Sequence, residues 1–141
     1  MIPTKFDYKR ATSIDDAIAL LKQSNGDGKL VAGGHSLVPL MKLRLSEPGV
    51  LVDIARIEGL SGIRQKDGAG GTIEIGATTT HTAVATSTIL LSQAPVVAEA
   101  ASEIGDPQVR NRGTLGGSLA HADPAADMPA VMVALDAEVH M

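Results

Sequence analysis

The stretch VAGGHSLVPLMKLRL, residues 31–45, places a glycine pair between two apolar segments. A second glycine pair lies in RNRGTLGGSLAHADPAAD, residues 110–127. Such a pair is typical of a tight turn, and it is equally typical of a place where the backbone comes close to a ligand. The residues around the two pairs bear on which of these interpretations applies.

The first 55 residues have the pattern of a small β–α–β–loop–α–β unit. Residues 13–22 predict a helix with a serine N-cap, and residues 29–32 and 50–54 predict two short buried strands. A second helix is expected after the first glycine pair, with Pro39 in its first turn, where proline is tolerated.

The pattern changes at about residues 55–60. Alternating residues on either side of DGAGG (67–71) predict a β-hairpin over residues 62–76. Three threonines (78–80) are most simply a strand end followed by a helix N-cap. Beyond them we expect helices over residues 80–91, 95–104 and 125–134, and the beginning of a strand over residues 136–141.

Composition indicates a globular protein whose core lacks aromatic residues. Hydrophobic residues make up 44% and charged residues 20% of the 141 residues, with one Phe, one Tyr and no Trp, which argues against disorder. Because the chain has no cysteine, disulfides, thiolate zinc sites and iron–sulfur ligands within it are excluded. We expect neither a signal peptide nor a membrane span, because no apolar run is long enough, and a cytoplasmic location is consistent with the lack of cysteine.

The charge distribution gives little support to nucleic-acid or metal binding. Residues 1–70 carry ten Lys/Arg and eight Asp/Glu, whereas residues 71–141 carry two and eight. No basic stripe with aromatic residues is present, so nucleic-acid binding is not expected. The acidic second half predicts a solvated surface or, alternatively, a face for a basic partner. The four histidines are not spaced as metal ligands, and no candidate nucleophile has a diagnostic spacing, so we predict neither a metal site nor a catalytic residue.

The first glycine pair has the layout of an anion site. A strand, two glycines, a hydroxyl group and a helix start follow one another, so backbone N–H groups and the Ser36 hydroxyl can converge on a pyrophosphate. The nucleotide-binding patterns GxxxxGK[ST] and GxGxxG are both absent. A plain glycine turn explains the residues as well. The residues concerned are Ala32, Gly33, Gly34, His35, Ser36 and Leu37.

The second glycine pair repeats this layout at residues 114–118. Two arginines precede it, and His121, Asp123 and Asp127 follow it. Two such loops predict a ligand with two polar ends, such as a dinucleotide, with one loop at the pyrophosphate and the other at the sugar chain. The aspartates would then accept hydrogen bonds from hydroxyl groups. Alternatively they are turn and cap residues of the helix that follows.

Three stretches in order along the chain resemble one protein family. They are VAGGHSLVPLMKLRL, GATTTHTAV (76–84) and IGDPQVRNRGTLGGSLAHADPAADMPAVMVALDAEV (104–139). Together they resemble the flavin subunit of the molybdenum hydroxylases, and most of all the medium subunit of aerobic carbon monoxide dehydrogenases. The resemblance covers essentially the whole chain, and the conjunction of AGGHS with TLGGSLAHADPAAD is far more specific than either stretch alone.

The resemblance implies an α+β fold, the two-lobed FAD-binding fold of the vanillyl-alcohol oxidase or PCMH type. It implies an N-terminal α/β lobe over residues 1–56 and a second α+β lobe over residues 57–141 that is incomplete, with non-covalent FAD held between them. The first flavin loop would comprise residues 32–37, and Ile104 would lie near the flavin. The second loop would contribute Gly113, Thr114, Gly116, Gly117 and Ser118, with His121 and Asp127 near the ribityl chain and the pyrophosphate.

The resemblance also implies a role in electron transfer. Substrate would be oxidised at a molybdenum cofactor in a large partner subunit. Electrons would pass through [2Fe–2S] clusters in a small partner subunit to FAD in this chain, and from FAD to an external acceptor. The lack of cysteine fits this division, because the clusters and the molybdenum belong to the partners.

The family subunit is about twice as long as this chain, which predicts a fragment, a split gene product or a truncated chain. One alternative is therefore a non-catalytic interaction fragment that no longer holds flavin. Another is a fold-related flavin reductase of the type that acts on cell-wall precursors, although TLGGSLAHADPAAD argues against it. A half-built sheet would also leave an unpaired edge open to a partner.

Overall fold

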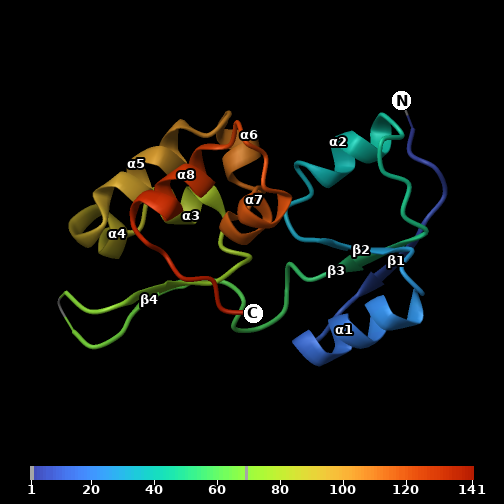
Figure 1. Cartoon of the computed structure of the whole chain (residues 1–141), viewed down its shortest axis with the longest axis horizontal. Helices are drawn as coiled ribbons and strands as arrows, with labels where there is room; N and C mark the ends of the chain where they lie inside the picture. The colour runs from blue at the N-terminus through green and yellow to red at the C-terminus, as the bar shows by residue number, and fades with distance from the viewer. Residues whose placement is uncertain (1, 69) are drawn as a thin grey trace. The chain divides into compact units, whose positions relative to one another are not determined.

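The computed structural model describes residues 2–68 and 70–141. The chain divides into two compact units, one ending at Leu60 and one beginning at Ser61; Figure 1 shows the elements of each. Among the described residues, no helix is long and apolar enough to cross a membrane. The assignment of residues 1–56 and 57–141 to two flavin-binding lobes stays a prediction.

The first unit is a three-stranded parallel sheet with one helix on each face. Strand β3 lies in the centre, and the two crossovers run in opposite directions, which puts the helices on opposite faces when both are right-handed; Figure 1 shows α1 and α2 on opposite sides of the strands. This confirms the predicted β–α–β–loop–α–β order. The elements are β1 (Asp7–Arg10), α1 (Ile14–Gln23), β2 (Gly28–Val31), α2 (Leu37–Lys42) and β3 (Val50–Asp53).

Helix α1 begins where its capping residues predict. The Ser13 hydroxyl accepts a hydrogen bond from Asp16 N at 3.0 Å, and the Asp16 carboxylate accepts one from Thr12 N at 2.8 Å. Two N–H groups at the helix start are thereby satisfied by side chains. The helix buries Ala17 in a cluster with Val52, so the cap and the apolar face together fix α1 on the sheet.

The second unit joins a short antiparallel hairpin to a group of helices. Val84, Leu90 and Met128 are fully buried in its core, and Ile63 and Ile75 of the hairpin pack against them. The predicted hairpin is confirmed. The elements are β4 (Ile63–Gln65), β5 (Ile73–Ile75), α3 (His81–Ala85), α4 (Thr88–Gln93), α5 (Pro95–Glu103), α6 (Pro107–Arg110), α7 (Leu115–His121) and α8 (Asp127–Ala134).

Two predicted elements of this unit are wrong. The single helix expected over residues 80–91 is two helices, because the Ser87 hydroxyl accepts a hydrogen bond from Leu90 N at 3.4 Å and starts α4 anew. The strand expected over residues 136–141 is absent, and these residues have no regular secondary structure. Asp136 takes a left-handed conformation (φ 50°), and the Ala137 N–H donates to Met132 O at 2.9 Å, which closes α8 with a Schellman turn.

The burial of α8 gives a first prediction. Replacing Met128 with alanine removes a fully buried side chain and should lower the free energy of unfolding by about 2–5 kcal/mol. The matched control is Val133→Ala on the same helix. Val133 is 77% exposed, so this change should stay within about 0.5 kcal/mol. Chemical denaturation of both variants measures the difference, and equal effects would contradict the described packing of α8.

Candidate functional site

The carboxyl end of the parallel sheet is where the first glycine pair lies. In open parallel sheets, ligands bind beyond the carboxyl ends of the strands, at the point where successive crossovers leave to opposite faces. Here that point is the end of β3, because β1 and β2 flank β3 and lead to helices on opposite faces. The last residue of β2, Val31, pairs with Asp53 of β3. Residues 32–36 therefore begin at the position where this fold class places a ligand.

The backbone of this segment has N–H groups without protein partners. In the part of the chain that the structure describes, the N–H groups of residues 32–37 donate to no protein acceptor, and the first that does is Val38, to Gly34 O at 2.9 Å. The Ser36 hydroxyl makes no cap hydrogen bond to α2. Gly34 has a φ of 77°, a left-handed conformation that favours glycine. Consecutive N–H groups of this kind require water or an anionic ligand as acceptor.

A cluster of polar side chains from β1 and β3 lies next to this segment in the sheet. The Asp53 carboxylate accepts hydrogen bonds from the Tyr8 hydroxyl and from Ala55 N, the latter at 2.8 Å, and lies 3.7 Å from the Arg10 Nε. The hydrogen bond to Tyr8 is the main reason that the pKa of Arg10 is raised, so this guanidinium stays charged. Asp53 thus has its own partners at the edge where an anion would bind.

The second glycine pair is not a loop, which corrects the prediction. It forms part of the first turn of α7, and the four N–H groups of residues 115–118 are all used within the protein. Two of them donate across to the segment before α3, and two donate to the cap residue Thr114. The hydrogen bonds are Leu115 N to Thr79 O (3.0 Å), Gly116 N to Ala77 O (2.9 Å), Gly117 N to Thr114 Oγ1 (3.1 Å) and Ser118 N to Thr114 O (3.0 Å). The two glycine segments therefore differ in chemistry.

The glycines of the second segment allow close contact with the protein itself. A Cβ on Gly116 would lie 2.7 Å from both the carbonyl oxygen and the Cβ of Ala77. A Cβ on Gly113 would lie 2.9 Å from Cδ2 of His81. Real Cβ atoms do not approach other atoms so closely, so only glycine lets the start of α7 lie against residues 77–81. The pair is explained by internal packing before any ligand is considered.

The polar groups that this region leaves available are side chains. Ser118 is half-buried, and no hydrogen bond of its hydroxyl is found among the described residues. His121 and Asp127 are exposed, at the end of α7 and the beginning of α8. Ile104 is half-buried at the end of α5, and its carbonyl accepts a hydrogen bond from Arg110 Nη1 at 2.9 Å. Ser118 and His121 thus lie on α7 and Asp127 follows the turn after it, whereas Ile104 lies on a separate segment at the end of α5.

The two aspartates have different positions. Asp123 is a turn residue, since its carboxylate accepts a hydrogen bond from Ala125 N at 2.9 Å. Asp127 is the first residue of α8, and Ala126 occupies the N-cap position. The turn interpretation holds for Asp123, the cap interpretation is wrong for Asp127, and the Asp127 carboxylate is left exposed.

His81 is a buried residue of this region whose burial the sequence did not indicate. It is 4% exposed, and among the described residues its Nδ1 has no hydrogen-bond partner, as is also true of the buried Thr78 hydroxyl. Burial lowers the pKa of His81, so the ring is neutral at pH 7. The three threonines predicted a helix cap at Thr80, which the structure confirms, but they contain no signal that the next residue is buried beneath Gly113.

The comparisons with known proteins identify the family. Residues 4–141 match the family model described as the FAD binding domain in molybdopterin dehydrogenase. The chain belongs to this family. Within the described residues no group of His, Asp or Glu side chains can hold a metal ion.

Relatives of this FAD-binding domain include subunits of several dehydrogenases. The chain is 51% identical to the 6-hydroxypseudooxynicotine dehydrogenase complex subunit alpha of Paenarthrobacter nicotinovorans, over 99% of this chain and 46% of that protein. It is 50% identical to the carbon monoxide dehydrogenase medium chain of Hydrogenophaga pseudoflava, over 97% and 47% respectively. The chain thus spans about half the length of these relatives.

Solved structures show the same fold. The carbon monoxide dehydrogenase of Hydrogenophaga pseudoflava that lacks the Mo-pyranopterin moiety matches with a TM-score of 0.91 at 51% identity, covering 95% of this chain and 46% of that one. Quinoline 2-oxidoreductase from Pseudomonas putida 86 matches with a TM-score of 0.87 at 37% identity, covering 94% and 45%. The predicted α+β class and the resemblance to the medium subunit are confirmed.

The contact beneath α7 gives a second prediction. Gly116→Ala should lower the free energy of unfolding of the second unit by about 1–3 kcal/mol, because the new Cβ meets backbone atoms of Ala77 that cannot move aside. Ala120→Ser, at an exposed position of the same helix, should change it by less than about 0.5 kcal/mol. Thermal and denaturant unfolding measure both, and a neutral Gly116→Ala would refute the packing role of this glycine.

Burial of His81 gives a third prediction. The folded-state pKa of His81 is below the ordinary value of 6.5, so the unfolded chain binds a proton as pH falls through that value while the folded chain does not. The free energy of unfolding should therefore decrease as the pH is lowered from about 7 to about 5. His81→Gln should reduce this slope, whereas Ala120→Ser, which leaves His81 in place, should not. An unchanged slope in His81→Gln would contradict a neutral buried His81.

Proposed function

We propose that this chain binds FAD non-covalently and serves as the flavin part of a molybdenum hydroxylase similar to carbon monoxide dehydrogenase. It would pass electrons from the [2Fe–2S] clusters of a partner subunit to FAD and on to an external acceptor. One observation carries the proposal, in a chain of an FAD-binding family. It is the run of N–H groups over residues 32–37, at the carboxyl end of the sheet, that have no partner among the described residues.

The first segment would bind the pyrophosphate. Its N–H groups offer several donors to phosphate oxygens without any lysine, and the half-buried Gly33 and Gly34 let the phosphate approach the backbone. The Ser36 hydroxyl is exposed and makes no cap bond, so it is available as one more donor. This chemistry fits a diphosphate better than it fits a neutral ligand.

The second segment would contribute side chains and shape rather than N–H groups. The first-turn N–H groups of α7 are already engaged, so the Ser118 hydroxyl is the donor that remains there. His121 and Asp127 would contact the ribityl chain and its hydroxyl groups, and Ile104 would lie against the flavin ring. Gly113, Thr114, Gly116 and Gly117 would hold α7 where these contacts are possible.

The role in electron transfer depends on partners. A bound flavin takes up electrons singly and releases them in pairs, which suits a junction between clusters and an acceptor. The chain has no cysteine, so iron–sulfur clusters would belong to a small partner subunit and the molybdenum cofactor to a large one. The relative from Paenarthrobacter nicotinovorans is named as a subunit of a dehydrogenase complex, which supports assembly with such partners.

A second candidate is an interaction fragment that holds no flavin. It is favoured by one observation, that the chain spans only 46% of the length of its relative from Paenarthrobacter nicotinovorans. The two candidates differ in whether the purified chain takes up FAD.

Flavin uptake gives a fourth prediction. The purified chain, mixed with FAD and freed of excess by gel filtration, should retain the visible absorbance of one bound flavin per chain. Gly33→Val should lower the affinity by at least about tenfold, or about 1.4 kcal/mol, because the side chain keeps phosphate from the backbone. Ser118→Ala should lower it by up to about tenfold through the loss of one hydrogen bond.

The control is Ser92→Ala, which removes an exposed hydroxyl on α4 that donates to Ile89 O in its own helix and should leave the affinity unchanged. A folded chain that elutes without colour would overturn the proposal for this chain and favour the interaction fragment. Uptake that Gly33→Val does not weaken would show that the pyrophosphate binds elsewhere.

A further inference from the structure

Helix α8 is apolar on all sides. Its sequence is DMPAVMVA, in which only the first residue is polar. A helix that is hydrophobic all round is normally buried all round. One side of α8 meets this expectation, because Met128 is fully buried and Val131 and Met132 pack against the core of the second unit.

The opposite side of α8 is uncovered. Val133 is 77% exposed, and Ala130 and Ala134 on the same side are exposed as well. We refer to these three residues as the outer face of α8. A groove beside it is lined by small and apolar residues that include Ala122, Pro124 and Pro129. Its only charged residue is Asp123, so the surface offers almost nothing that water solvates well.

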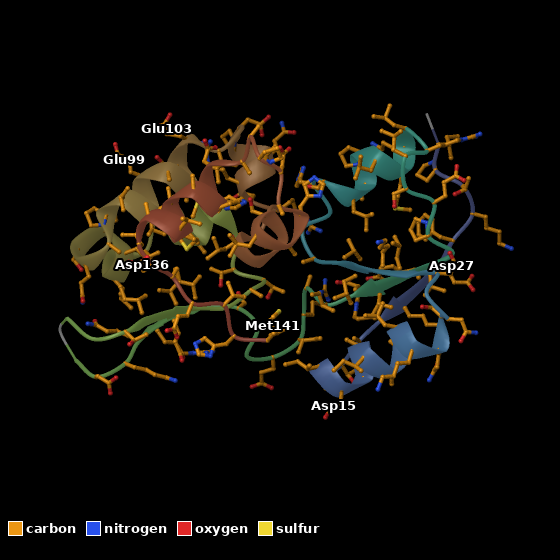
Figure 2. The ribbon with its side chains drawn as sticks, in the orientation of Figure 1. Asp15, Asp27, Glu99, Glu103, Asp136 and Met141 are labelled. Carbon is orange, nitrogen blue, oxygen red and sulfur yellow. The ribbon has the colours of Figure 1, made fainter. Side chains whose placement is uncertain are left out.

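Helix α5 of the same unit, in contrast, has a polar side that faces the solvent. Its inner side buries Val97, Ala98 and Ala101, and its outer side carries Glu99 and Glu103. Figure 2 shows both carboxylates pointing away from the unit. The helix therefore follows the usual amphipathic pattern, whereas α8 lacks a polar side. The difference indicates that the outer side of α8, unlike that of α5, is suited to contact with another polypeptide.

The length of the relatives indicates what that polypeptide is. The match to the Hydrogenophaga pseudoflava medium chain uses 97% of this chain but only 47% of that protein, and the matched part is the N-terminal part. The remaining half of the relatives therefore continues from the segment that follows α8. It is also long enough to supply the apolar surface that the outer face of α8 lacks.

We propose that the outer face of α8 binds a polypeptide that corresponds to the second half of the medium subunit in the relatives, whether it is joined to this chain or separate. The interface is apolar, centred on Val133, with Asp123 at its rim. We assign this place to polypeptide rather than to FAD, because Val133 lies six residues, or about 9 Å along the helix axis, beyond Asp127, the residue expected near the cofactor. The inference does not rest on flavin binding by this chain.

Thiol labelling tests the proposal directly, because the chain has no cysteine. Val133→Cys places a single thiol on the outer face of α8, and Leu91→Cys places one on α4, where Leu91 is 54% exposed. Each variant is labelled alone, with FAD, and after co-expression with the second half of the Hydrogenophaga pseudoflava medium chain. The Val133→Cys thiol should react at least about tenfold more slowly in the co-expressed complex, and the Leu91→Cys thiol should change by less than about twofold.

The other outcomes overturn the proposal. Equal labelling of Val133→Cys with and without the second half would do so, provided that a covalent fusion of the two halves gives the same result. Protection by FAD alone would show that the cofactor covers α8. Protection that grows with the concentration of this chain alone would identify a second copy as the occupant. Equal protection of Leu91→Cys would indicate non-specific association.

Discussion

The second unit depends on a backbone contact between the first turn of α7 and residues 77–81. Gly116 N and Leu115 N donate to carbonyls of this segment, and His81 N donates back to Gly113 O. A Cβ at Gly116 or Gly113 would overlap its neighbours, so glycine is required at both positions. Helix α3 starts from this segment and α8 packs beside α7, and both reach the core through Val84 and Met128. Loss of the contact would displace the side chains of α7 that are proposed to meet the cofactor.

The two glycine pairs therefore have different structural roles. In the second, glycine permits close packing within the protein, and the amides donate hydrogen bonds to protein acceptors. In the first, the amides of residues 32–37 have no protein partner among the described residues, and the strand order places them at the end of the parallel sheet. A diphosphate needs donors, which only the first segment has in number. A ribityl chain needs acceptors and single donors, which the side chains around α7 provide.

Much of the first unit could be predicted from local sequence. Ser13 fixed the start of α1, and short apolar runs located β2 and β3, because caps and burial are local properties of the chain. The second unit was harder to predict from local sequence, for a physical reason. Two adjacent glycines predict a loop from their helix propensity, but Gly116 and Gly117 lie in a helix because tertiary contacts with Ala77 and Thr114 override it. Ser87 caps the start of a new helix, α4, and the residues next to it in the sequence did not predict this break.

Hydrogen exchange of individual amides, with and without FAD, tests the central claim most directly. The account predicts that the amides of residues 115–118 are protected before FAD is added, because they are bonded within the protein. The amides of residues 33–37 should exchange rapidly without FAD and become protected when it binds. Protection that appears only at residues 115–118, with residues 33–37 unchanged, would contradict the assignment of the pyrophosphate to the first glycine segment.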